Sequence, residues 1–229
     1  MVSIDSSTVR WSLPEAERRG KPLVVLLHGV GSHEGDLAGL APYLPDRFVF
    51  ASLRAPLPFG SGFSWYPLST PGAPEYAPVD DAADAVLRWI DTLGDTHPVV
   101  GVLGFSQGGS MALQLLRRRP GHFAFAVVLA GFVVPGAPTG VDSVLATSRP
   151  AVFYGRGDAD QVIAADAVER TTAWLTDHAE AEQRVYAGLG HGISQEELDD
   201  VTAFLARISP DQVLRAADLS ALGTPDAAH

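Results

Sequence analysis

A serine flanked by glycines is the residue of this sequence best placed to do chemistry. It is Ser106, the centre of a G-x-S-x-G motif at residues 104–108. The apolar residues 99–103 before it predict a buried strand, and residues 111–116 after it suit a helix. A serine on a sharp turn between strand and helix has the context of a nucleophile elbow, in which glycines let the two elements pass close together. The amide of Gln107 would then face an oxyanion developing on a substrate; the alternative is a glycine-rich turn with an incidental serine.

A serine hydroxyl becomes a strong nucleophile only when a base removes its proton and a carboxylate orients that base. We predict that His191 is the base, because it follows the last predicted strand in a turn flanked by glycines. The acid is Asp158 or Asp160, which share one loop after another predicted strand, and the pattern alone does not separate them. The order serine, acid, histidine along the chain is that of an α/β-hydrolase.

A second glycine-rich turn follows the apolar run at residues 22–27. Its glycines expose backbone amides, so we expect the amide of Val30 to be a second oxyanion donor, the alternative being an ordinary strand-to-helix turn. His28 begins this turn and suits its support better than the role of base. Together with Phe132, which follows another predicted strand, and Trp65, it is our expected lining of a substrate pocket. Trp65 comes from a long loop rich in proline and glycine, which it could instead pin to the surface.

Strands and helices alternate along the chain, which predicts an α/β fold with a mostly parallel sheet and helices on both faces. Ligands of such sheets bind beyond the carboxyl ends of the strands, where Ser106 and His191 would meet. A capping box, with Ser194 as N-cap and Glu197 reaching back, should start the last helix. The expected strands are 9–11, 22–27, 48–53, 99–103, 125–129, 150–155 and 183–186, and the expected helices are 34–44, 80–93, 111–116, 165–178 and one after Ser194.

Length and composition limit the class of protein. With 229 residues, of which 46% are hydrophobic, we assign one domain to residues 1–208 and a partly disordered tail, with a short helix around 213–214, to residues 209–229. A formal net charge of −11 argues against nucleic acids and anionic membranes as partners. Without cysteine there is no disulfide, thiolate nucleophile or cysteine-bound metal. No apolar run approaches the roughly 20 residues of a membrane span, and no leader is evident, so we expect a cytoplasmic protein.

Several short segments resemble, in their order and spacing, the phospholipase/carboxylesterase family of α/β-hydrolases, which includes the acyl-protein thioesterases. The resemblance extends over residues 23–206. Any one segment is a weak signal, but the set is specific to this family. The matching segments are 27–32, 53–56, 65–66, 104–109, 157–163 and 190–194.

The resemblance implies a site as well as a fold. The family's acid follows a glycine by three residues and precedes a β-branched residue by three, a pattern that selects Asp160 in this sequence. The resemblance also puts the two oxyanion amides on Val30 and Gln107, and it implies hydrolysis of carboxylic ester or thioester bonds without a metal or cofactor. Arg156 and Ala164 depart from the family, which often has histidine and proline at these positions.

The expected function is therefore that of a serine hydrolase acting on small to medium acyl esters, with thioesters as a further substrate class. Ser106 would attack, His191 would carry the proton and Asp160 would orient the histidine. Two alternatives are acyl transfer to an acceptor other than water and a non-catalytic binding protein with the same fold. We expect a small-molecule substrate as the partner, with the protein a monomer or a homodimer.

Overall fold

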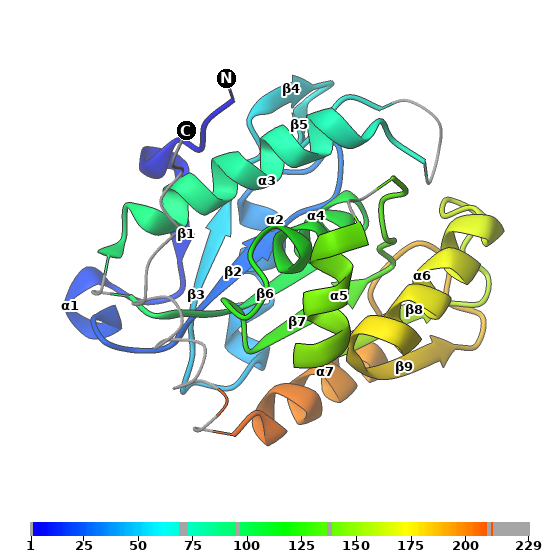
Figure 1. Cartoon of the computed structure of the whole chain (residues 1–229). Coiled ribbons are helices and arrows are strands. Elements are labelled where there is room, and N and C mark those ends of the chain that lie inside the picture. Colours follow the sequence, from blue (N-terminus) through cyan, green and yellow to red (C-terminus); the bar gives the residue numbers. More distant parts are fainter. Residues whose placement is uncertain (1, 69–72, 95–96, 137–138, 210–211, 213–229) are drawn as a thin grey trace.

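A seven-stranded sheet forms the centre of the molecule (Figure 1). The structure is a computed structural model that describes residues 2–68, 73–94, 97–136, 139–209 and 212. All neighbouring strands are parallel except β1 and β3, which confirms the expected mostly parallel sheet. In spatial order the strands are β1 (Arg10–Trp11), β3 (Val49–Leu53), β2 (Leu23–Leu27), β6 (Val99–Phe105), β7 (Phe125–Leu129), β8 (Ala151–Gly157) and β9 (Glu180–Tyr186).

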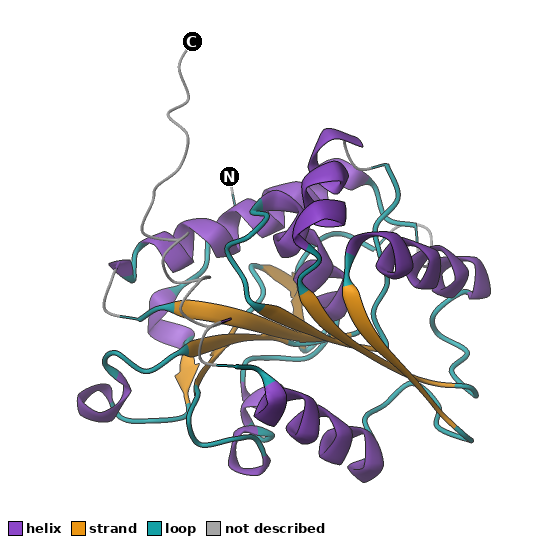
Figure 2. Ribbon diagram, turned by 60° about the horizontal axis from the view of Figure 1, so that its bottom comes forward, coloured by secondary structure: helices purple, strands orange, loops and turns teal. Residues whose placement is uncertain are grey.

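Helices cover both faces of this sheet (Figure 2), because the side chains of its inner strands alternate between two apolar cores. In β2, Leu23, Val25 and Leu27 face one core, whereas Val24 and Leu26 face the other. The first core is closed by α3 (Tyr76–Asp91), α4 (Gln107–Arg118), α5 (Thr139–Ser148) and α6 (Ala165–His178), and the second by α2 (Gly35–Ala38) and α7 (Gln195–Arg207). The remaining helical segments are α1 (Glu15–Arg18) and 3-10 turns at Ser6–Thr8 and Ala41–Tyr43.

The helix expected at residues 34–44 is not continuous. It is divided into α2 and the 3-10 turn Ala41–Tyr43. Gly39 and Pro42 explain the division. Glycine loses more conformational entropy than other residues when it enters a helix, and proline lacks the amide that a longer helix would use. Leu37 and Leu44, two of the apolar residues whose spacing predicted this helix, are buried in the second core.

Several further elements were not expected from the sequence, among them α1. The long loop at residues 54–78 contains a hairpin of β4 (Leu57–Phe59) and β5 (Gly62–Ser64), and α3 begins inside it at Tyr76. Helix α5 was missed altogether. Its sequence is rich in threonine and serine, which are poor helix formers, so its order depends on packing of Leu145 into the core.

The tail expected at residues 209–229, with its short helix at 213–214, lies outside the described residues except for 209 and 212. Among the helices that are described, none combines the length and the apolar character needed to cross a membrane.

Glu197 is a buried acid at the start of α7. As predicted, Ser194 caps this helix, with its hydroxyl accepting the Glu197 amide at 3.1 Å. The Glu197 carboxyl does not complete the capping box: it is 1% exposed, neither oxygen has a hydrogen-bond partner, and it fills the space beside Gly155 of β8. Burial raises its pKa to about 7; the nearby Ser194 amide opposes this by a smaller amount, and the charge of Asp200 adds a still smaller rise.

Replacing Glu197 by glutamine should stabilise the protein at pH 8 and change it little at pH 4. An acid whose pKa is raised from 4.5 to about 7 on folding loses folding free energy as the pH rises through that interval. We expect Glu197→Gln to recover about 2 kcal/mol at pH 8, or roughly 4–8 °C in melting temperature, measured by thermal unfolding at both pH values. The exposed neighbour Glu196→Gln is the control, and equal effects of the two variants would contradict the prediction.

Candidate active site

Ser106 occupies a strained turn between β6 and α4. Its φ of 56° and ψ of −116° lie outside the regions that L-residues usually adopt. The flanking glycines are required by close backbone contacts: a Cβ at Gly104 would lie 2.0 Å from the Gly108 carbonyl oxygen, and one at Gly108 would lie 1.8 Å from that of Leu27. The Ser106 amide donates to the Leu129 carbonyl at 2.8 Å. The elbow is therefore held by β2, β7 and α4 together.

The structure brings Ser106, His191 and Asp160 into one hydrogen-bonded series. His191 Nε2 lies 2.8 Å from Ser106 Oγ, and His191 Nδ1 lies 2.8 Å from Asp160 Oδ2. The other Asp160 oxygen accepts the amides of Val162, at 2.8 Å, and Ile163, at 3.3 Å. Burial alone would raise the pKa of Asp160, but the hydrogen bond from His191 and the two amides outweigh it and lower the pKa. Asp160 is thus an ionised carboxylate directed at the histidine.

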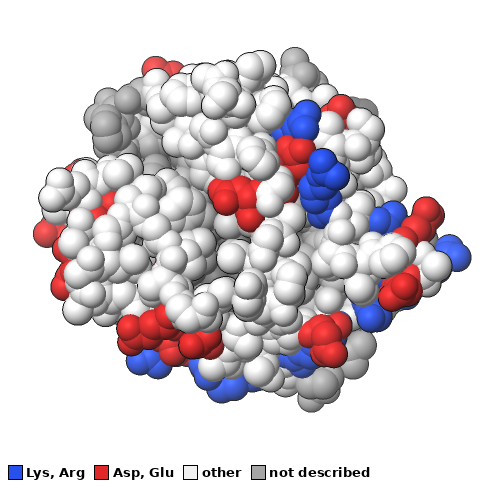
Figure 3. Space-filling view, turned by 180° about the vertical axis from the view of Figure 1, so that it is seen from behind, with Lys and Arg blue, Asp and Glu red and all other residues white. Residues whose placement is uncertain are grey.

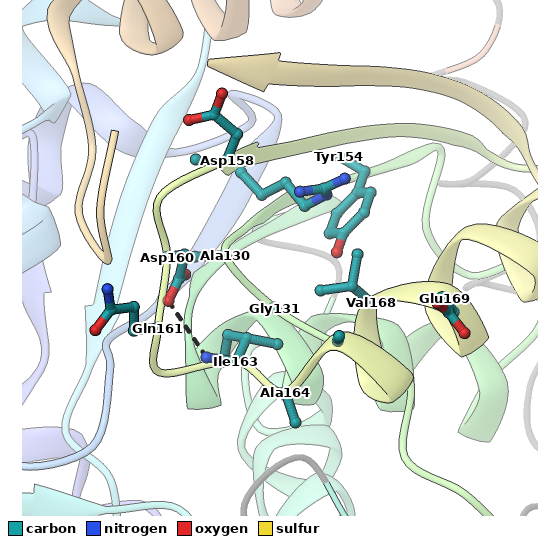
Figure 4. A pocket seen from close by; sticks show the side chains of 13 residues that line it. Ala130, Gly131, Tyr154, Asp158, Asp160, Gln161, Ile163, Ala164, Val168 and Glu169 are labelled. Atoms are coloured by element: carbon teal, nitrogen blue, oxygen red, sulfur yellow. Dashed lines mark hydrogen bonds between the residues drawn. The ribbon is translucent and has the colours of Figure 1, made fainter. Parts of the chain in front are cut away.

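Asp158, the alternative acid, lies elsewhere. Its carboxylate points away from Asp160 (Figure 4) and accepts the Gly188 amide at 2.6 Å. A second backbone bond runs from the Ala159 amide to the Leu189 carbonyl at 3.0 Å. These two bonds join the loop that carries Asp160 to the loop that carries His191.

The expected oxyanion donors flank Ser106. The amide of Gln107 begins α4 directly after the serine. Gly29 packs beside the elbow, since a Cβ at this glycine would lie 3.5 Å from Ser106 Cβ, and Val30 follows it. Strand β5 fixes this turn: Phe63 accepts the amide of Gly31 at 2.8 Å and donates its own amide to Ser32 at 2.9 Å.

Two of the expected pocket residues are buried and support this turn from behind. His28 is fully buried, with Nε2 accepting the Ala55 amide at 3.1 Å and Nδ1 donating to the Gly29 carbonyl at 2.7 Å. Burial lowers its pKa, so the ring is neutral. Trp65 is 1% exposed and donates its indole N–H to the His28 carbonyl at 2.8 Å. The third residue, Phe132, is 6% exposed and packs in the first core.

The side chain of Gln107 has a structural role that the sequence pattern did not reveal. Its Oε1 accepts the Trp65 amide at 2.8 Å, and its Nε2 donates to the Tyr66 carbonyl at 2.9 Å. Ser110 extends the network through a 2.5 Å hydrogen bond with the Tyr66 hydroxyl. A polar side chain directly after the elbow serine, at the start of a helix that follows a buried strand, is the signal that could have pointed to such a network.

An ion pair between Glu34 and Arg54 holds the outer side of the same region. The guanidinium donates twice to the carboxylate, at 2.7 and 2.6 Å, and lies over the Phe63 ring at 4.7 Å from its centre. The two hydrogen bonds lower the pKa of Glu34 to about 2, so this buried carboxylate is ionised. Sequence reasoning did not predict the pair, because its partners lie on separate segments, an expected helix and a long loop.

A cavity of about 520 Å³ lies beside Asp160, at the carboxyl ends of β7 and β8 (Figure 4). None of the three expected pocket residues belongs to its lining. Within the described part of the chain, no group of three or more His, Asp or Glu side chains is arranged to hold a metal ion. The lining residues are Ala130, Gly131, Tyr154, Arg156, Gly157, Asp158, Asp160, Gln161, Ile163, Ala164, Ala165, Val168 and Glu169.

A mostly parallel sheet with a serine elbow at one strand end, and an acid and a histidine on later loops, defines an α/β-hydrolase. Residues 12–209 match the family described as Phospholipase/Carboxylesterase. The chain belongs to this family, as the resemblance in its motifs predicted, and it is therefore a hydrolase of carboxylic esters.

Known relatives agree with this assignment. The chain is 24% identical to acyl-protein thioesterase 1 of Saccharomyces cerevisiae, over 80% of this chain and 91% of the yeast protein. The crystal structure of esterase PE8 is 29% identical and superposes with a TM-score of 0.74, covering 91% of this chain and all of the other. A carboxylesterase from Mesorhizobium loti, 21% identical, shares the fold with a TM-score of 0.74 over 90% of this chain and 99% of its own.

Replacing Gly62 by alanine should reduce esterase activity without touching Ser106. A Cβ at Gly62 would lie 2.1 Å from the Gly31 carbonyl oxygen, so the turn that carries the Val30 amide must move. We expect kcat on p-nitrophenyl acetate to fall by about 10- to 100-fold, as for a displaced oxyanion donor. Ser61→Ala, at the exposed tip of the same hairpin, should keep full activity. An unchanged kcat in a folded Gly62→Ala protein would contradict the positioning role of β5.

Proposed function

We propose that the protein is a serine esterase that cleaves small to medium acyl esters through an acyl-enzyme intermediate. The observation that carries the proposal is the series Ser106, His191 and Asp160, with 2.8 Å between hydrogen-bonding atoms at each step. The strained serine turn and the ionised state of Asp160 support it, because a triad needs an exposed nucleophile and a carboxylate that orients the base.

In the first half of the reaction, Ser106 Oγ attacks the ester carbonyl carbon while His191 Nε2 takes the hydroxyl proton. Asp160 holds the ring so that Nε2 is free to accept, and it stabilises the imidazolium that forms. The amides of Val30 and Gln107 donate to the oxyanion. The intermediate collapses by breaking the bond to the alcohol oxygen, which leaves with the proton from His191.

In the second half, water attacks the acyl-enzyme, and His191 takes a proton from the water. Collapse of the second intermediate breaks the bond to Ser106 Oγ, which regains a proton from His191 and releases the carboxylic acid. A thioester would follow the same steps with a thiol as leaving group. The name of the yeast relative, an acyl-protein thioesterase, supports testing thioesters beside oxygen esters.

The surface favours a neutral substrate. Most of the face seen in Figure 3 is uncharged and hollowed near its middle, while Lys and Arg side chains lie mainly towards one side and the lower margin of that view. The formal net charge of −11 also opposes binding of strongly anionic molecules. The cytoplasmic location and the monomeric or homodimeric state stay predictions.

Three substitutions test the proposed roles. Ser106→Ala should abolish turnover of p-nitrophenyl butyrate, and Asp160→Asn should lower kcat on the order of 10⁴-fold, the effect of the same change in a well-studied triad. Asp158→Asn should change kcat far less, because asparagine keeps an oxygen that can accept the Gly188 amide.

The same variants can be tested with a fluorophosphonate probe, which reacts only with an activated serine. We expect labelling of Ser106 in the unmodified protein and none in Ser106→Ala. A protein that is folded but neither labelled nor active would favour the non-catalytic alternative. Formation of a new ester or amide from an added alcohol or amine would favour acyl transfer. A larger loss in Asp158→Asn than in Asp160→Asn would overturn the acid assignment and leave the reaction class intact.

A further inference from the structure

Several small residues line the cavity beside Asp160. Ala130 and Gly131 follow the end of β7 and contribute no large side chain, and Ala130 adopts a positive φ of 46°. Gly157 ends β8 in contact with the loop that carries His191, since a Cβ there would lie 1.8 Å from the Leu189 carbonyl oxygen.

The cavity begins next to the nucleophile. Ala130 follows Leu129, whose carbonyl accepts the Ser106 amide at 2.8 Å. Gly131 also touches the first turn of α4, since a Cβ at Gly109 would lie 2.9 Å from Gly131 Cα. A substrate bound at Ser106 could thus extend one of its ends into the cavity.

One polar group in the cavity wall lacks a partner. Tyr154 is 1% exposed, its hydroxyl makes no hydrogen bond, and it points towards Val168 of α6 (Figure 4). A buried hydroxyl without a partner is costly in folding, and such groups often have a functional explanation. Burial raises the pKa of Tyr154 to about 12, so the oxygen keeps its proton and can donate a hydrogen bond. The oxygen is itself buried in the cavity wall, so a group that bonds to it must pack closely against Tyr154.

The charges of the lining decide what kind of acceptor suits this hydroxyl. Arg156 is the single cation among the lining residues, against the carboxylates of Asp158, Asp160 and Glu169. At the Tyr154 hydroxyl itself the charge of Arg156 acts more strongly than that of Asp160. The lining as a whole has three carboxylates to one guanidinium, which disfavours a substrate carboxylate relative to a neutral oxygen. Apolar side chains such as Ile163 and Val168 suit the carbon chain that leads to that oxygen.

We propose that this cavity is a substrate subsite for an aliphatic group that carries a neutral oxygen, such as a keto or hydroxyl group, and that Tyr154 donates a hydrogen bond to that oxygen. The proposal rests on the proposed esterase function, because it places the rest of the substrate at Ser106. The group can belong to the acyl or to the alcohol side of the ester, and the experiment separates the two.

The test uses two pairs of esters that differ only by a distal keto oxygen. p-Nitrophenyl 5-oxohexanoate against p-nitrophenyl hexanoate examines the acyl side, and 4-oxopentyl acetate against pentyl acetate examines the alcohol side. We expect the unmodified protein to favour the keto ester in one pair by roughly three- to tenfold in kcat/KM, the effect of one hydrogen bond. In Tyr154→Phe this preference should fall to about 1.

Tyr186→Phe is the matched control. Tyr186 lies on the neighbouring strand β9, and its hydroxyl donates to Asp200 at 2.9 Å, outside the cavity lining. This variant should keep the preference for the keto ester. Tyr154→Phe should also melt no lower than the unmodified protein, because it removes only an unpaired hydroxyl.

A binding experiment separates this inference from the proposed function. In the Ser106→Ala background, calorimetry measures the affinity of the same esters. Affinity does not depend on turnover, so the measurement examines the subsite separately from the role of Ser106. Loss of the affinity difference on adding Tyr154→Phe would support the subsite. Four outcomes would overturn it. The preference for the keto ester could be absent, or it could be the same with and without the Tyr154 hydroxyl. Tyr154→Phe could weaken both esters equally, or p-nitrophenyl 4-carboxybutanoate could bind more strongly than the keto ester.

Discussion

The close approach of three backbone segments around Ser106 is the constraint on which the site depends. Gly108 lies against the Leu27 carbonyl and Gly104 lies against Gly108, so no side chain fits between β2, β6 and the first turn of α4. This packing over-determines the turn, and that is why the serine can keep a positive φ. Packing of the two cores against the sheet offsets the cost of this strained turn. The turn places the Ser106 hydroxyl beyond the strand ends.

Parallel strands explain how the other groups reach that hydroxyl. Strands β8 and β9 run side by side, so the loops that follow them leave the same edge of the sheet, one with Asp160 and one with His191. The Gly188 amide bonds to the Asp158 carboxylate and the Ala159 amide bonds to the Leu189 carbonyl, so the two loops are joined. The turn that carries Val30 is held separately, by β5 and by buried side chains.

Much of this architecture could be predicted from the sequence, because periodicity and glycine placement are local signals. The strands, the elbow and the histidine followed from them, whereas Asp160 was separated from Asp158 only by resemblance to a family. Contacts between distant segments could not be predicted: the pairing of Glu34 with Arg54 and the burial of His28 and Trp65 depend on how the hairpin β4–β5 folds over the turn. Helix α5 was missed for a similar reason, since its residues favour a helix only once it is packed.

The outer strand β9 has a consequence for self-association. It ends the sheet, and its residues include Glu182 and Arg184, which pair with each other at 2.8 Å, while Arg207 of α7 also contacts Glu182. A charged, salt-bridged border discourages a second sheet from adding its own strand there. Polymerisation through backbone pairing at this border is therefore opposed by the native surface.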